Sequence, residues 1–204
     1  MRELIDFTKN GAPLPNKPVV ITFDDGFLNN MAYALPLIRE YSMKAVFSPV
    51  GAYSDLYTLN GDRNLYYAYM TWDDIRGAAE SGLLEICSHS YDMHGRSPRL
   101  GASKKEGEDT KTYLRLFKDD VLKMQSLLRE KSGVECIVYA YPFGAVSEGT
   151  AEALASCGIK AALTCREAAN TVTRGDTAAL FSLGRYNRSG LMSTDEFMAK
   201  AGIE

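Results

Sequence analysis

Short apolar runs alternate with helix-like segments along most of the chain. Several runs are rich in β-branched residues, which predicts strands over residues 19–23, 44–50, 83–87, 136–141, 160–164 and 180–183. Helical spacing and helix-start signals predict helices over residues 27–41, 71–82, 109–131 and 147–157, with a last helix from residue 193. Residues 56–70 and 96–107 show no clean period and predict loops. This alternation is typical of an α/β fold with a largely parallel sheet.

The helix predicted over residues 109–131 has a clear one-sided pattern, with apolar positions at Leu114, Phe117, Val121, Met124 and Leu128. Polar residues able to do chemistry follow the predicted strands instead. In barrels and open α/β sheets, active sites collect at the carboxyl ends of the strands. We therefore expect a functional site at that edge.

Composition narrows the class of protein. A length of 204 residues fits a single domain, residues 1–204, and 46% hydrophobic with 24% charged residues is ordinary for a globular protein. The net charge of -3 lacks the excess of lysine and arginine that a nucleic-acid partner requires. The sequence shows neither a signal peptide nor an apolar run of about 18 residues, so we expect a soluble domain without a transmembrane segment.

The cysteines do not form a recognisable metal or redox motif. No pair has CxxC spacing among Cys87, Cys136, Cys157 and Cys165. Free, packed thiols are favoured over disulfides, because nothing in a chain of this size requires a covalent crosslink.

The only two histidines follow the strand predicted over residues 83–87. His89 and His94 are five residues apart, in the segment SHSYDMH at residues 88–94. A lone histidine is more often a hydrogen-bonded polar residue than a metal ligand. Two in one segment after a strand favour metal binding more strongly, although their spacing alone leaves both interpretations open.

Two carboxylates follow another predicted strand, at Asp24 and Asp25, and Gly26 comes next. Such a segment is commonly a simple turn. Two carboxylates that faced one pocket would repel each other unless a cation or a proton separated them. A metal ion beside Asp25 would leave Asp24 ionised and able to accept a proton. Neighbouring side chains on a strand point to opposite faces, so the backbone must turn here, and Gly26 permits a turn.

Together these residues form a set of two histidines and one carboxylate. That set suits zinc, and also iron(II), cobalt or nickel. Three protein ligands leave positions open for water and substrate, which is the arrangement of a catalytic metal site.

Residues 22–26 (TFDDG) resemble the first motif of the NodB-homology polysaccharide deacetylases, carbohydrate esterase family 4. His89-Ser90 followed by His94 resembles their second motif. The five-residue histidine spacing is similar to that of the poly-N-acetylglucosamine deacetylases of biofilm systems. The resemblance covers nearly the whole chain, from about Leu14 to the end.

The resemblance implies a distorted, incomplete (β/α) barrel that removes N-acetyl groups from an N-acetylglucosamine-containing polysaccharide. It implies that Asp24 is the catalytic base and that Asp25, His89 and His94 bind one divalent metal ion, with zinc favoured. The family also suggests an extracellular or cell-envelope location.

The third family motif falls on residues Tyr141, Pro142 and Phe143. These residues would contact the substrate, and the backbone N–H of Phe143 would help to stabilise an oxyanion. The open alternative is a strand end packed with aromatic side chains. The family arginine that braces the catalytic aspartate is replaced by Ala140. Arg185 is a candidate substitute, although it could equally be a solvated arginine.

The resemblance also implies a further histidine that acts as the general acid, and this chain has none. In the biofilm-type relatives that histidine lies ahead of the first Asp-Asp motif, and residues 2–17 resemble the last stretch of that region. We therefore expect an additional upstream segment in the natural protein and feeble activity from these 204 residues. Tyr139, Tyr141 or Tyr186 could donate a proton in principle, but an unshifted tyrosine titrates near about 10.

Two rival functions follow from the same residues. The first is a catalytically silent domain that binds metal or glycan, favoured by the missing acid and opposed by the intact Asp24. The second is an iron(II) oxygenase with the same ligand set. Oxygenases of that kind usually have a β-sandwich, which the alternating strands and helices disfavour.

Overall fold

The computed structural model describes residues 1–203 and contains two small parallel sheets. The first has the order β1-β2-β3, formed by β1 (Ile21–Asp25), β2 (Ala45–Pro49) and β3 (Leu84–Ile86). The second pairs β4 (Val138–Ala140) with β5 (Ala161–Leu163). A single parallel bridge between Ser88 and Tyr139 joins the two sheets. A second, between Leu163 and Leu183, adds one residue pair beside β5. The predicted α/β class is confirmed, and across residues 1–203 the sheets do not close into a barrel.

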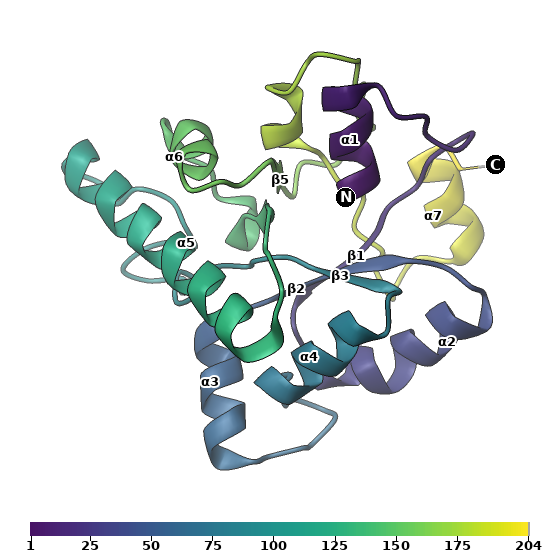
Figure 1. Cartoon of the computed structure of the whole chain (residues 1–204), viewed down its shortest axis with the longest axis horizontal. Coiled ribbons are helices and arrows are strands. Elements are labelled where there is room, and N and C mark those ends of the chain that lie inside the picture. Colours follow the sequence, from purple (N-terminus) through teal and green to yellow (C-terminus); the bar gives the residue numbers. More distant parts are fainter. Residues whose placement is uncertain (204) are drawn as a thin grey trace.

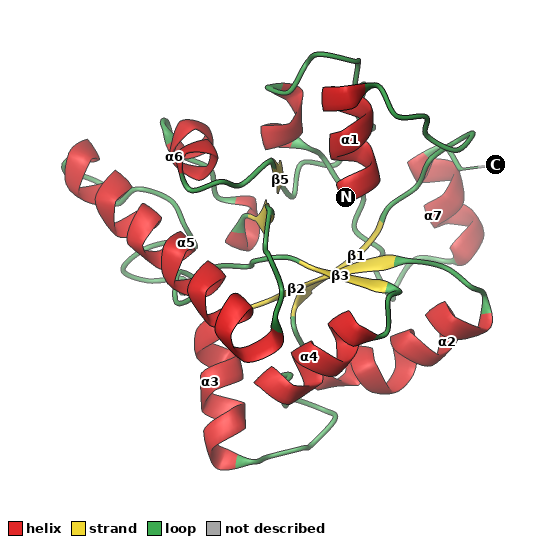
Figure 2. Cartoon of the chain, viewed as in Figure 1, coloured by secondary structure: helices red, strands yellow, loops and turns green. Residues whose placement is uncertain are grey.

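Helices cover both faces of the first sheet (Figures 1 and 2). Helices α2 (Leu35–Glu40) and α4 (Trp72–Glu80) lie on one side, and α1 (Arg2–Asn10) and α7 (Thr194–Ala201) lie on the other. The remaining helices are α3 (Gly51–Asn60), α5 (Thr110–Ser132) and α6 (Thr150–Ser156). None of the helices within residues 1–203 has both the length and the apolar character needed to cross a membrane.

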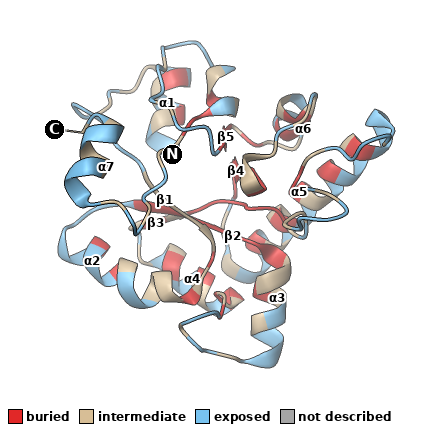
Figure 3. Ribbon diagram, turned by 180° about the vertical axis from the view of Figure 1, so that it is seen from behind, coloured by how far each residue is buried: buried red, intermediate tan, exposed pale blue. Residues whose placement is uncertain are grey.

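The pattern of β2 explains how the sheet separates two cores. Phe47 points into the larger core, which includes Ile75 and Phe117, whereas the adjacent Val46 points into a smaller core with Leu180. Successive strand residues face opposite sides of a sheet. Because both sides are covered, every residue of β2 is buried, and all of them except Ser48 are apolar (Figure 3).

Helix α5 confirms the amphipathic prediction. Its buried positions are Tyr113, Phe117, Val121, Met124 and Leu128, which pack into the larger core. The helix begins where the Asp109 side chain accepts a hydrogen bond from the backbone of Thr112, and it ends at Gly133 with φ 70°. The start of α4 is confirmed in the same way, with a capping box between Thr71 and Asp74.

Four segments differ from the predictions. The predicted loop over residues 56–70 begins inside α3, whose buried positions are only Gly51 and Ser54, so the helix shows no clear apolar period. The predicted strand over residues 180–183 is a 3-10 turn, Ala179–Ser182, that buries Leu180 and makes a single bridge at Leu183. The predicted helix over residues 27–41 opens with a π-helical turn at Asn30–Ala34. Helix α1 had no predicted counterpart.

Strand β1 begins later than predicted and includes both aspartates. Val19 and Val20 are 60% and 44% exposed and precede the strand, while Asp24 and Asp25 pair in register with Ser48 and Pro49 of β2. This register places the two carboxylates at the carboxyl end of the sheet, the edge predicted for a functional site.

Candidate metal centre

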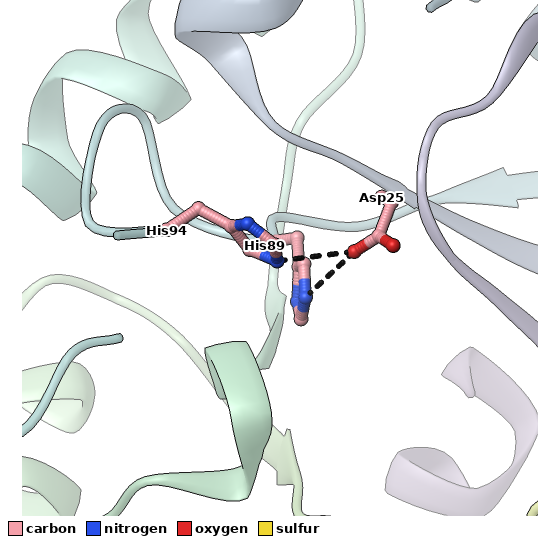
Figure 4. Close-up of side chains that lie close together, drawn as sticks. All are labelled: Asp25, His89 and His94. Atoms are coloured by element: carbon pink, nitrogen blue, oxygen red, sulfur yellow. Dashed lines mark ion pairs between the residues drawn. The ribbon is translucent and has the colours of Figure 1, made fainter. Parts of the chain in front are cut away.

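Three side chains from two segments converge at the carboxyl end of the first sheet (Figure 4). Asp25 ends β1, His89 follows β3, and His94 lies five residues further on. Asp25 Oδ1 is 3.3 Å from His89 Nε2 and 3.1 Å from His94 Nε2. His89 is buried, and His94 and Asp25 are partly exposed, so the group is open to solvent on one side.

The backbone turns at Asp25 itself. Asp25 has φ 67°, and Gly26 follows with φ 77°. Asp tolerates this left-handed conformation better than most residues, at a cost of about 1–2 kcal/mol. At Gly26 no other residue fits, because a Cβ would lie 2.7 Å from Cβ of Pro49. The expected turn is therefore present, and it starts one residue earlier than Gly26.

The hydrogen bond of His89 makes a cation in this group necessary. His89 Nδ1 lies 2.9 Å from the carbonyl oxygen of Ala140, which can only accept, so Nδ1 carries the proton. In the neutral ring Nε2 is then an acceptor, and it faces Asp25 Oδ1, a second acceptor. A proton or a metal cation must lie between them.

The donor atoms fit a divalent metal ion. Bonds of about 2.0–2.2 Å in a tetrahedral site place neighbouring donor atoms roughly 3.4 Å apart, close to the two measured distances. All three donor atoms lie within 4.8 Å of one another. His94 Nδ1 lies 3.4 Å from the Tyr53 hydroxyl, which orients the second ring.

The charge of Asp25 is stabilised by its neighbours. Burial acts to raise the pKa of Asp25, but hydrogen bonds and charge from His89 and His94 outweigh it and hold the pKa well below its ordinary value. Asp25 therefore stays ionised over the whole physiological range, as a metal ligand must.

Arg185 binds the neighbouring carboxylate in a two-pronged ion pair. Its guanidinium donates to Asp24 Oδ1 at 2.9 Å and to Oδ2 at 2.7 Å. It also donates to the Thr164 carbonyl at 2.9 Å and to the Thr22 hydroxyl at 3.2 Å. Burial acts to lower the pKa of Arg185, and the hydrogen bond to Asp24 more than compensates and raises it. Of the two alternatives for Arg185, the structure shows the one that braces Asp24.

The third-motif residues divide between framework and site. Tyr141 is fully buried, its N–H donates to the Leu163 carbonyl and its hydroxyl to Thr150, so its polar groups are already engaged inside the fold. Pro142 is buried beside it. Phe143 has φ 58°, and its ring lies 4.7 Å from the His94 ring.

The backbone N–H of Phe143 is available to a ligand. It donates no hydrogen bond to any backbone or side-chain acceptor within residues 1–203. The left-handed conformation of Phe143 turns the chain two residues after Tyr141, next to the metal-centre residue His94. This N–H is therefore a polar group of the third motif that could still contact a substrate.

Tyr139 and Tyr141 are unsuited to donating a proton. The Tyr139 hydroxyl is buried and has no hydrogen-bond partner among residues 1–203, and burial raises its pKa well above the ordinary value. Burial likewise raises the pKa of Tyr141. A higher pKa makes a weaker acid at neutral pH, and both hydroxyls are buried, so both residues are poor proton donors.

Two helices hold the histidine-bearing segment in place. The first N–H groups of α3, from Gly51 and Ala52, donate to the carbonyls of Ser90 and Tyr91 at 3.1 Å and 2.7 Å. Gly51 is required at this contact, because a Cβ there would lie 2.7 Å from the Tyr91 ring. The segment between the two histidines is therefore pinned to the start of α3.

Asp120 of α5 holds the same segment from the other side. Its two carboxylate oxygens accept the backbone N–H groups of Tyr91 at 2.9 Å and Asp92 at 2.8 Å. Burial raises the pKa of Asp120, and these two hydrogen bonds offset only part of that rise. Sequence patterns did not identify this residue. The one signal available in the sequence was that Asp120 is an acidic residue close to the apolar stripe of an amphipathic helix.

Comparison with known proteins agrees with this geometry. A model of the polysaccharide deacetylase family matches residues 11–162. The chain belongs to the polysaccharide deacetylase family. The chain is 29% identical over 169 residues to the poly-β-1,6-N-acetyl-D-glucosamine N-deacetylase of Escherichia coli strain K12. That alignment covers 74% of the chain and 25% of the E. coli protein, so the chain spans about a quarter of that relative's length.

Two solved structures share the fold of this chain. The deacetylase domain of BpsB from Bordetella bronchiseptica superimposes with a TM-score of 0.76 at 26% identity, covering 89% of this chain and 75% of that one. IcaB from Ammonifex degensii superimposes with a TM-score of 0.76 at 26% identity, covering 99% of this chain and 79% of that one. The expected resemblance to NodB-homology deacetylases of the biofilm type is confirmed. Family membership also argues against an iron(II) oxygenase.

The four cysteines are free, as predicted, and none belongs to the metal centre within residues 1–203. Cys87 is two residues before His89 but is buried, and burial raises the pKa of its thiol well above the ordinary value. A neutral thiol is a poor metal ligand.

Proposed function

We propose that this deacetylase chain is a metal-dependent hydrolase that removes N-acetyl groups from an N-acetylglucosamine-containing polysaccharide. One observation carries the proposal: a ligand set of Asp25, His89 and His94 lies beside a carboxylate, Asp24, that Arg185 holds by two hydrogen bonds. A simple metal-storage or structural site would have no need of the second, braced carboxylate.

The metal would be held by Oδ1 of Asp25 and by Nε2 of each histidine. Zinc suits two imidazoles and one carboxylate best, and cobalt, nickel or iron could take its place. A bound ion would lower the pKa of a coordinated water and polarise the acetyl carbonyl. His89 is kept in the required tautomer by its bond to Ala140.

Asp24 would accept the proton of the attacking water. Arg185 prevents the carboxylate from rotating and keeps both of its oxygens at fixed positions, 2.7 Å and 2.9 Å from the guanidinium nitrogens. A base that is already held in the reactive orientation avoids the entropic cost of being ordered during the reaction. Because Arg185 also donates to the Thr164 carbonyl, it fixes Asp24 relative to the carboxyl end of β5.

The Phe143 N–H would donate to the oxygen that becomes negative as water adds to the acetyl carbonyl. A single oxyanion donor typically contributes about 10²–10³ in rate. Both histidines of the chain serve as ligands in this scheme, so neither of them supplies the proton for the leaving amine. We also propose that the open strand ladder is an incomplete (β/α) barrel of the NodB type, acting on glycan at or outside the cell envelope.

Paired substitutions test the roles of the two carboxylates. Asp24→Asn should keep bound metal and lose deacetylation of an N-acetylglucosamine oligomer, because the amide cannot accept a proton. Asp25→Asn should instead weaken metal binding. Metal content by elemental analysis and released acetate are the measurements. Metal loss from Asp24→Asn with retention in Asp25→Asn would show that the roles are reversed.

The same measurements test the rival function of a silent binding domain. If the wild-type chain binds metal and the oligomer but releases no acetate from the oligomer or from an aryl acetate, the chain is a binding domain. Acetate release that depends on Asp24 would exclude this alternative.

A further inference from the structure

We propose that a separate sugar-binding subsite lies beside the metal centre, in a cavity between the chain after β1 and the loop after α3. The cavity has a volume of about 420 Å³ and is lined by Asn29, Tyr33, Asn64, Leu65 and Tyr66. The ligand would be an N-acetylglucosamine unit that flanks the unit being deacetylated. This inference rests on the proposed function for its substrate class.

The lining residues have the chemistry of a neutral sugar site. Tyr33 and Tyr66 are 66% and 94% exposed, and flat aromatic rings at the surface can pack against the C–H face of a pyranose. Asparagine amides can donate to and accept from hydroxyl and acetamido groups. No lining residue is charged, which suits an uncharged sugar better than a phosphate or an acidic ligand.

The loop that carries Asn64 and Tyr66 is ordered before any ligand binds. The Asn64 N–H donates to Asp62 at 2.9 Å, and Asn64 Oδ1 accepts the N–H of Tyr66 at 3.0 Å. The Asn64 carbonyl accepts the N–H groups of Tyr67 and Ala68. Asn64 Oδ1 is bonded to Tyr66 and the Asn64 side chain also hydrogen-bonds to the Tyr67 side chain, so Asn64 holds the loop in one conformation. A loop that is already held in one conformation loses little entropy on binding.

Aromatic side chains connect this cavity to the metal centre. Tyr53 touches His94 through its hydroxyl, and the Tyr53 ring lies 4.4 Å from the Tyr69 ring. Tyr69 stacks on Phe27 at 4.5 Å. The Phe27 and Tyr69 segments pair antiparallel, and they continue directly into the two walls of the cavity. A glycan chain could therefore run from the metal centre along these half-buried rings toward the subsite.

The two walls are fixed relative to each other by backbone hydrogen bonds. Leu28 N–H donates to the Ala68 carbonyl and Met70 N–H donates to the Gly26 carbonyl, both at 2.8 Å. Gly26 directly follows the metal ligand Asp25. The distance between the cavity and the metal is therefore set by the fold, which suits a polymer of regular repeat.

Binding measurements on single-residue variants test the subsite. Tyr66→Ala, Tyr33→Ala and Asn64→Ala would each be titrated by calorimetry with an N-acetylglucosamine oligomer, in a background of Asp24→Asn to prevent turnover. We expect the two tyrosine variants to bind the oligomer about five- to tenfold more weakly, since one aromatic contact is lost. Metal content and thermal unfolding should match those of the background protein.

Tyr41→Ala is the matched control, because Tyr41 is 65% exposed but lies at the end of α2 outside the cavity. It should bind the oligomer as the background protein does. Oligomer affinity that is unchanged in all three cavity variants would overturn the subsite. A change in oligomeric state instead of glycan affinity would show that this face joins two copies of the chain, and would also overturn it.

These outcomes separate the subsite from the proposed function. If the protein releases no acetate but oligomer affinity still depends on Tyr33 and Tyr66, the enzymatic proposal fails and the subsite stands. If acetate is released and the affinity for the oligomer is the same with and without the two tyrosines, the subsite fails and the enzymatic proposal stands.

Discussion

Replacing Arg185 should destabilise the protein measurably, because no other cation contacts Asp24 within residues 1–203. Removing one partner of a buried ion pair costs about 3–5 kcal/mol, since it leaves an unpaired charge behind. The Arg185 and Asp24 side chains keep 17% and 24% of their exposure, so solvent screens part of that cost. We expect Arg185→Met, which keeps the aliphatic volume, to lower the free energy of unfolding by about 2–3 kcal/mol.

Urea denaturation measures this change. A urea dependence of about 2–3 kcal/mol per molar, in the range for a chain of this size, converts the loss into a midpoint shift of roughly 1 M. Arg185→Lys should fall between wild type and Arg185→Met, because a point charge cannot bond both carboxylate oxygens and Thr164 together. Arg166→Ala is the control: Arg166 is exposed and donates one long bond of 3.3 Å to Ser182, so its loss should stay within about 0.5 kcal/mol.

A double-mutant cycle with Asp24→Asn isolates the pair itself. If the two side chains interact as the distances indicate, the double variant should be more stable than the sum of the single losses predicts, by about 1–2 kcal/mol. Losses that add within about 0.5 kcal/mol would refute the reasoning, as would an Arg185→Met midpoint equal to that of wild type.

Four further predictions concern the metal and the segment that carries the histidines. His89→Ala or His94→Ala should remove most bound metal by elemental analysis, and wild-type metal affinity should fall as pH drops through about 6.5, where free histidine is protonated; full occupancy in both variants would contradict the ligand assignment. Asp120→Asn should weaken metal binding about tenfold, measured by competition with a chelator, because one of the two bonds to the segment of Tyr91 and Asp92 is lost. Burial raises the pKa of Asp120 in the folded state above its ordinary value of 3.8, so the free energy of unfolding should decrease as pH rises through the folded-state pKa. Urea midpoints of Asp120→Asn should not show this decrease. A decrease as large as that of wild type would assign it to another group. Cys87→Ala should leave metal at full stoichiometry, and metal loss from that change alone would reveal a thiolate ligand.

Local signals in the sequence were sufficient for much of the framework. The apolar stripe of α5, the capping box of α4 and the runs that became β1 to β5 each depend on residues a few positions apart. Helix periodicity and capping are short-range energetic effects, so they can be read from sequence. The prediction was wrong for the tyrosine-rich α3, where the apolar period is weak. It was also wrong for residues 179–182, where a short apolar run forms a 3-10 turn that buries Leu180 instead of a strand.

The candidate site shows the same division between local and tertiary information. Asp24, Asp25, His89 and His94 could be singled out from sequence, because each follows an apolar run and carboxyl ends of parallel strands share an edge. The sequence left Arg185 with two alternatives. Only the tertiary structure brings its guanidinium to Asp24, across 161 positions of chain.

Tertiary structure alone also revealed Asp120 and the conformation of Phe143. Asp120 belongs to a helix whose pattern describes only its buried face, and its bonds to Tyr91 and Asp92 depend on how α5 packs against the segment after β3. The positive φ of Phe143 is imposed by its surroundings against the preference of an aromatic residue. Contacts of this kind arise when separate elements pack together, and the energy that selects them is absent from any one segment taken alone.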